Sequence, residues 1–235
     1  MKTAFAAIMV NVAKRIPQQP NREDIFNFTP HIPHLAEVAT HLSQYLSHED
    51  LIWPFRGLGW FYYGQGLYQQ AEPWYKLCKD IAENRLGLKH PDVAASLNNL
   101  AELYRSTGRY GEAQALYQQA LELTKRLLGD NHPDVATSLN NLALLYESTG
   151  RYSEAEPLFQ QALELYKSLL GDNHPNVATI LNNLAALYGS IGRYNEAEPL
   201  YQQALAICEQ ILGVGHPDTI RVRGNYAIFL RKPYR

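Results

Sequence analysis

One segment of 42 residues occurs three times in succession, at 90–131, 132–173 and 174–215. The first two copies are identical at 33 positions and differ at nine. A fixed period of 20–50 residues is typical of arrays in which each copy is one supersecondary unit that buries its apolar face against its neighbours. We therefore expect a repeat architecture rather than one closed core. The same spacing predicts a degenerate copy at 48–89 and a half copy at 216–235.

Each copy is predicted to form two antiparallel helices, which we call A and B. Helix A begins at a His-Pro pair, because proline suits the first helical turn, where its missing N–H is not needed. Gly108 is expected to end helix A in the left-handed conformation, and Gly129 to end helix B. Ser153 and Glu156 have the spacing of a capping box at the start of helix B. No segment alternates with period two for long enough to indicate a strand, so the predicted fold class is all-α.

Small and large residues are placed at regular positions within each copy. Ala101, Ala113 and Ala120 allow two helices to approach closely, and Tyr117 fills the remaining space. This pattern resembles the tetratricopeptide repeat (TPR), and the 42-residue period with its LNNLA and LLGDNHPDVA segments is similar to the kinesin light chain variety. The resemblance covers residues 48–235 and implies an α-solenoid that forms a right-handed superhelix, with a concave, peptide-binding face built from the A helices.

The N-terminal part lies outside the repeats. Residues 1–30 are predicted to form a first helix and a polar linker at Gln18–Pro30, and residues 31–47 to form a capping helix over the first copy. A short signal peptide is the alternative interpretation of the opening MKTAFAAIMVNVAKR. The stretch from Ile32 to Tyr75 is also similar to the junction between an NTPase module and the TPR array in bacterial STAND-type (NB-ARC) proteins, although this chain has no phosphate-binding G-x-x-x-x-G-K-[ST] motif.

The few changes between copies indicate a candidate binding face. An α-helix advances 100° per residue, which places the changed positions 95, 102 and 105 on the arc opposite the packed side of helix A. Either exposed positions have drifted, or this arc lines a groove that is tuned to a ligand. The candidate groove residues are Trp53, Arg56, Trp60, Tyr63, Asn98, Glu102, Arg105, Asn140, Leu144, Glu147, Asn182, Ala186 and Arg221. Such a groove would be aromatic at its first end, amide-lined in its middle and basic at its last end.

Two of these assignments have structural alternatives. The TPR resemblance implies that Asn98, Asn140 and Asn182 hold the backbone of an extended peptide, because an amide both donates and accepts. Paired asparagines could instead link neighbouring repeats. Similarly, the aromatic residues of the first copy are either a binding anchor or the core beneath the capping helix, and residues 24–28 could occupy the groove as a built-in ligand.

The sequence argues against metal or catalytic chemistry. The histidines of the His-Pro pairs occur once per copy, which separates them by about 10 Å. That is too far for two of them to bind one zinc ion, so a role at the helix start is predicted. No catalytic motif or cofactor motif is present, so we expect no enzyme, no cofactor and no metal.

The composition bears on partners and location. The net charge of −2 does not favour nucleic acid, and no apolar run approaches the roughly 20 residues of a membrane helix. Cys78 and Cys208 are far apart in predicted helices, which favours a reduced, cytoplasmic protein. Five basic residues against Asp218 make the C-terminal half copy either a charged cap or an attractant for an acidic peptide or nucleic acid; they are Arg221, Arg223, Arg231, Lys232 and Arg235.

The leading functional hypothesis is a protein–protein interaction scaffold that binds an extended peptide or partner segment. One alternative is the sensor or regulatory arm of a STAND-type signalling ATPase. Another is a structural solenoid that self-associates through its terminal helices, in particular through an exposed Ile228-Phe229-Leu230 segment.

Overall fold

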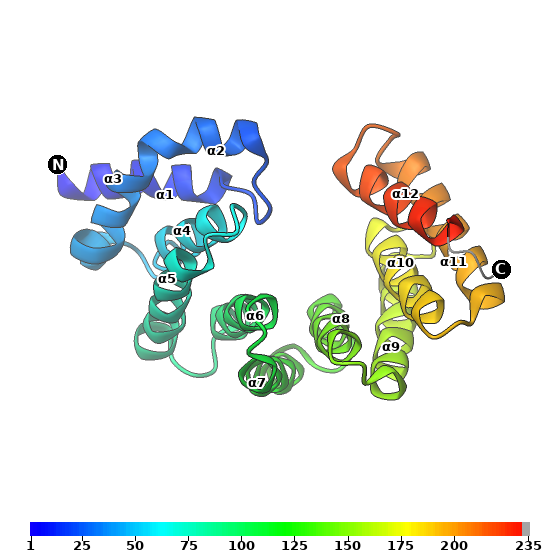
Figure 1. Cartoon of the computed structure of the whole chain (residues 1–235). Coiled ribbons are helices and arrows are strands. Elements are labelled where there is room, and N and C mark those ends of the chain that lie inside the picture. The colour runs from blue at the N-terminus through cyan, green and yellow to red at the C-terminus, as the bar shows by residue number, and fades with distance from the viewer. Residues whose placement is uncertain (232–235) are drawn as a thin grey trace. The chain divides into compact units, whose positions relative to one another are not determined.

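The computed structural model describes residues 1–231, which form helices joined by short turns, as Figure 1 shows. No β-strand occurs in that part of the chain, which confirms the all-α prediction. The helices divide into two compact units, Met1–Leu123 and Thr124–Arg235, which are treated separately below. The right-handed course of the whole array stays a prediction.

The first unit contains the N-terminal helices, the degenerate copy and most of the first full copy. Its helices are α1 (Lys2–Arg15), α2 (Arg22–Phe28), α3 (Ile32–Glu37), α4 (Trp53–Tyr63), α5 (Tyr68–Ile81) and α6 (Pro91–Ser106), followed by α7 (Tyr110–Leu128), which continues past the unit boundary. The helices of the second unit are α8 (Pro133–Ser148), α9 (Tyr152–Leu170), α10 (Pro175–Ser190), α11 (Tyr194–Ile211) and α12 (Pro217–Leu230). The A helices are thus α4, α6, α8, α10 and α12, and the B helices are α5, α7, α9 and α11.

The histidine of each His-Pro pair is the N-cap of the A helix that follows. The Nδ1 atoms of His90, His132, His174 and His216 each accept a hydrogen bond from the backbone N–H two residues further on, at 3.1–3.2 Å. A capping side chain satisfies one of the amide donors that have no partner within the helix. The predicted role of these histidines at the helix start is confirmed.

Glycines in the left-handed conformation mark the ends of helices A and B. Gly108 has a φ of 76° and Gly129 a φ of 80°, the left-handed conformation that a residue with a side chain rarely adopts. The equivalent glycines of the other copies have the same sign of φ. Helix A therefore stops at the same position in each full copy, and the chain reverses within three residues to begin helix B.

The predicted capping box at Ser153 is wrong. Helix α9 already begins at Tyr152, and its N-cap residue Arg151 makes no side-chain cap. Arg151 instead stacks over the ring of Tyr146 at 4.1 Å and forms a two-pronged ion pair with Glu154. Arg109 and Arg193 make the same contacts in their copies. Cation–π stacking thus stabilises the turn where a cap was expected.

The core lies at the seam between helices A and B. In the second unit, Ala143, Ala155 and Ala162 are fully buried, and Phe159 fills the space between the helices with no exposed surface. In the first unit, Ala101, Ala113, Ala120 and Tyr117 occupy the equivalent positions and are equally buried. The alternation of small and large side chains therefore acts as the sequence predicts.

The region predicted to be a linker contains a helix. Asn21 accepts hydrogen bonds from the backbone of Glu23 and Asp24, and Asp24 accepts one from the Asn21 backbone, so that a capping box starts α2. Phe28 at the end of α2 is buried and Phe26 is exposed. Residues 24–28 are therefore helical, and their role as a built-in ligand stays a prediction.

The predicted capping helix is not continuous. Helix α3 ends at Glu37, after which Val38–Leu42 forms a widened π-helical turn and Ser43–Tyr45 a tight 3₁₀ turn. No glycine or proline marks this break in the sequence. Helix α1 contacts α3 and packs on α4, where a Cβ atom on Gly57 would lie 3.2 Å from the Ala13 Cβ. Two helices rather than one therefore cover the degenerate copy.

Candidate functional site: the faces of the A helices

Helix α4 has one side that is not fully buried. Trp53, Arg56, Trp60 and Tyr63, which recur at helical spacing, are half-buried, and we call them the aromatic face. The residues between them that contact the rest of the unit, among them Phe55 and Leu58, are buried. The structure therefore brings the four predicted residues of the first copy together on one surface.

The two tryptophans of the aromatic face enclose the arginine. The rings of Trp53 and Trp60 meet edge to face, with centroids 6.4 Å apart. The Arg56 guanidinium lies 5.0 Å from the Trp53 ring and 5.9 Å from the Trp60 ring, and its Nη2 donates to Asp92 of α6 at 2.8 Å. Only 11% of the Arg56 side chain is exposed, so this ion pair is largely shielded from water. The Arg56–Asp92 ion pair therefore links the first half of α4 to the start of α6.

Three polar atoms near this cluster are buried without a hydrogen-bond partner. They are the N–H groups at Trp60 Nε1 and Arg56 Nε, and the amide oxygen Oδ1 of Asn98 on α6. A buried polar group with no partner costs roughly 1–3 kcal/mol, and such groups are rare in folded proteins. The two donors and the acceptor correspond to the groups that a peptide backbone would complement.

A second link between α4 and α6 centres on Glu102. Its carboxylate accepts hydrogen bonds from Arg105 at 2.6 and 3.0 Å, from Tyr63 at 3.0 Å and from Tyr117 at 2.7 Å. Burial alone would raise the pKa of Glu102, but the hydrogen bonds and charge of Arg105 outweigh it and hold the pKa below its usual range. Burial also raises the pKa of Tyr63 to about 12, so its hydroxyl stays a donor. Glu102 and Arg105 thus stabilise the face.

The A helices of the second unit are joined by a chain of amides. Asn225 donates to Asn182, which donates to Asn183, which donates to Asn140, which donates to Asn141, at 2.9–3.3 Å. We call this series the asparagine chain. Asn140 is 9% exposed and Asn182 is 2% exposed. The geometry favours the structural alternative at these two positions, where the amides link neighbouring repeats, over the predicted peptide contact.

The remaining predicted groove residues differ in accessibility. Leu144, Glu147 and Ala186 are half-buried, and Arg221 is exposed and paired with Asp218 at 3.0 Å. The basic end is therefore partly neutralised, and Lys232 and Arg235 lie outside the described residues. Of the predicted apolar segment on α12, Ile228 is 63% exposed but Phe229 is buried, because its ring lies 5.2 Å from that of Tyr201 and covers Gly189.

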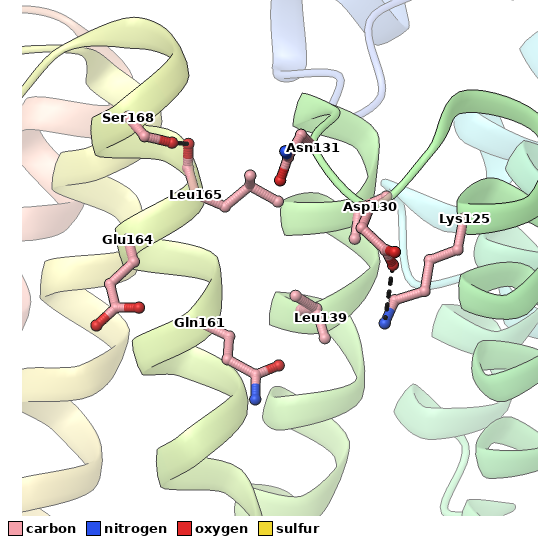
Figure 2. A pocket seen from close by; sticks show the side chains of 9 residues that line it. Lys125, Asp130, Asn131, Leu139, Gln161, Glu164, Leu165 and Ser168 are labelled. Atoms are coloured by element: carbon pink, nitrogen blue, oxygen red, sulfur yellow. Dashed lines mark hydrogen bonds and ion pairs between the residues drawn. The ribbon is translucent and has the colours of Figure 1, made fainter.

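Two of the hollows in the described structure are lined by residues outside the aromatic face and the asparagine chain. One of about 370 Å³ in the second unit is lined by the Asn131 and Gln161 amides and by Leu139. Figure 2 shows Leu165 of α9 reaching toward α8 and the ion pair of Lys125 with Asp130 on the other side. The other hollow, of about 430 Å³ in the first unit, lies among α5, α6 and α7. Neither brings together groups for a defined chemistry. Within residues 1–231 no cluster of side chains is placed to hold a metal ion, and no helix is long and apolar enough to cross a membrane.

Helix hairpins of fixed length that pack in series define a helical repeat protein of the solenoid class. The chain belongs to the tetratricopeptide repeat family, whose model matches residues 50–126, 92–168, 148–210 and 176–232. The TPR fold generally mediates protein–protein interaction, and TPR proteins are typically non-enzymatic scaffolds. None of the curated proteins compared matches this chain significantly.

Several solved structures share this fold. BtubC (BKLC) from P. vanneervenii is 26% identical, with a TM-score of 0.68 over 88% of this chain and 82% of that one. A second structure contains TPR-like repeats that are nearly identical to one another and are assigned to a kinesin light chain of Podosopora anserina. It is 24% identical to this chain, with a TM-score of 0.69 over 90% of this chain and 98% of that one. A Rap protein complexed with Competence and Sporulation Factor is 17% identical, with a TM-score of 0.65 over 87% and 60%. The kinesin light chain type that the repeat length indicated is thus confirmed, whereas the resemblance to the STAND junction stays a prediction.

Proposed function

We propose that this chain is a protein-interaction scaffold that binds an extended segment of a partner protein along the faces of its A helices. The aromatic face of α4 is the anchor of this interaction. Membership of the family supports the general role, and the geometry of α4 and α6 supports the aromatic face as the binding position. We assign no catalytic step and no cofactor to the chain.

One observation carries the proposal: the aromatic face is half-exposed and contains two N–H groups that have no acceptor. Large aromatic side chains and arginine dominate binding hot spots. A partner carbonyl that reaches Trp60 Nε1 or Arg56 Nε would remove the cost of leaving that donor unpaired. Both donors are buried in the free chain, so binding has to expose them to the partner.

The asparagine chain supports a division of roles between the two units. The amides of Asn140 and Asn182 already bond to other asparagines and are buried. Asn98, at the same position in the repeat, has an unpartnered oxygen. We therefore place backbone recognition in the first unit, with Trp60 and Asn98 as its polar contacts, and give the second unit a supporting role.

The test uses a displayed library of random 12-residue peptides selected on the wild-type chain. The affinities of the selected peptides are then measured for wild type, for Trp60→Ala and for Leu144→Ala, which changes the same repeat position in the second unit. We expect Trp60→Ala to weaken binding by roughly 2–4 kcal/mol and Leu144→Ala to have little effect.

Thermal melting separates the two roles of the aromatic face. If Trp60 is an anchor, Trp60→Ala binds weakly but melts close to wild type. If it is core, the variant loses roughly 3–5 kcal/mol of stability, and the anchor assignment is wrong. A library that yields no binding peptide would contradict recognition of an extended segment.

A further inference from the structure

We propose that the histidine cap of α10 is an acid-sensitive point in the array, at which protonation of His174 loosens the start of the third full copy. The basis is the bond that each His-Pro histidine makes. Nδ1 accepts from a backbone N–H, which requires a neutral imidazole with its proton on Nε2. Imidazole is the side chain that ordinarily takes up a proton between pH 5 and 8.

Protonation converts the cap from an acceptor into a donor. The backbone N–H of Asn176 then loses its acceptor, and a positive charge lies next to the positive end of the helix dipole. The start of α10 then lacks its side-chain cap, and we expect it to be less stable in acid. His174 is half-buried, so water reaches the ring.

The other three caps have a carboxylate that compensates. Asp92 Oδ2 lies 3.6 Å from His90 Nδ1, and Asp134 and Asp218 lie 3.7 Å from the Nδ1 atoms of His132 and His216. A protonated imidazole at these positions forms an ion pair in place of the lost cap bond. The third full copy has Asn176 where the others have aspartate, so His174 has no such carboxylate.

The charged groups near this end of α10 do not replace the missing aspartate. The start of an A helix lies beside the ends of the B helices and the starts of the neighbouring A helices. Of the groups there, Lys167 pairs with Asp172, Glu209 with Arg223 and Asp218 with Arg221. Asp134 lies beside His132. Within residues 1–231, no ion pair joins His174 to any of them.

Hydrogen exchange of the backbone amides, followed by NMR between pH 5 and 7.5 and corrected for the intrinsic exchange rate, tests the proposal. In wild type the Asn176 amide should lose protection by about fivefold at low pH, the factor that corresponds to one N-cap bond of about 1 kcal/mol. The Asp134 amide on α8 should change less, because the ion pair compensates there. The ¹⁵N shifts of the ring report whether Nδ1 is an acceptor at neutral pH.

Two variants decide the outcome. His174→Asn keeps a good cap that does not titrate and should abolish the loss at Asn176, and Asn176→Asp should reduce it to the level of α8. His132→Asn, the matched control, should leave the loss at Asn176 unchanged. Equal acid sensitivity at α8 and α10 in wild type, or a loss at Asn176 that persists in His174→Asn, would overturn the proposal.

Discussion

The A helices α4 and α10 occupy the same place in the repeat, yet they are joined to their neighbouring A helices by different chemistry. Helix α10 carries Asn182 and Asn183 and is joined by the asparagine chain. Helix α4 has Arg56 and Gly57 at the equivalent positions, and its links to α6 are the Arg56–Asp92 ion pair and the Tyr63–Glu102 hydrogen bond. One backbone arrangement thus accepts either neutral amides or charged groups between its repeats.

The difference has a consequence for binding. In the second unit the neutral amides of the asparagine chain hydrogen-bond to one another. In the first unit the bulky Trp60 occupies the position of Ala186, and polar atoms beneath the aromatic face stay unpartnered. Under the function proposed above, the regular repeats serve stability and the degenerate copy serves recognition. The variants below break or sharpen this comparison, from the largest expected effect to the smallest.

The seam of the degenerate copy is predicted to tolerate the least added volume. Gly59 occupies the position of Ala143, and a Cβ atom on Gly59 would lie 2.2 Å from the ring of Tyr75. We expect Gly59→Leu to reduce the free energy of unfolding by about 3 kcal/mol and Ala143→Leu by about 2 kcal/mol, both through overpacking. Urea unfolding of the two variants measures the difference, and equal losses would show that the two seams are alike.

Two substitutions, one that removes a hydroxyl group and one that adds it at the same repeat position in the next copy, test the hydrogen bonds to Glu102. Tyr117 donates to Glu102, whereas the buried Phe159 lies at the same position in a copy that has Leu144 in place of the carboxylate. We expect Tyr117→Phe and Phe159→Tyr each to destabilise by about 1–2 kcal/mol, the first by removing a hydrogen bond and the second by burying a hydroxyl without a partner. A Phe159→Tyr protein as stable as wild type would mean that the second unit can satisfy that hydroxyl.

The charge of Glu102 should make the stability of the first unit depend on pH. Because the folded-state pKa of Glu102 is lowered, its contribution is present above the unfolded-state pKa and is lost as the pH falls through the folded-state value. Glu102→Gln should cost about 1 kcal/mol at pH 7 and progressively less below about pH 4. Unfolding at several pH values, compared with wild type, tests this, and a loss that is constant with pH would contradict it.

The smallest effect is expected at an uncrowded glycine. Gly224 lies within α12, and no atom lies within 4 Å of a Cβ placed there. Gly224→Ala should therefore stabilise the chain by about 0.5–1 kcal/mol, because alanine has the higher helix propensity. Paired with Gly59→Leu, this variant distinguishes a glycine that close packing requires from one that it does not. A destabilised Gly224→Ala protein would indicate a contact of α12 beyond those described.

Local sequence patterns determined the framework of this protein. The 42-residue period, the His-Pro starts, the left-handed glycines and the buried alanines each depend on a few neighbouring residues, so the hairpins were predictable copy by copy. The capping box at Asn21 was equally local and was available to the same reasoning. The Arg-Tyr stack of Arg151 on Tyr146 could also have been found, because in each full copy an arginine follows the last tyrosine of helix A by five residues and precedes the first glutamate of helix B by three.

Only the tertiary structure decided which contacts identical residues make in different copies. Asn98 and Asn182 occupy the same repeat position, yet Asn182 is bonded on both sides and Asn98 has an unpartnered oxygen. Trp60 is neither fully core nor fully exposed, and its ring lies against Trp53 and Arg56 of its own helix. The physical reason is that a side chain on an A helix meets partners about 43 residues away in the next copy, so its role depends on which residue the neighbouring repeat presents.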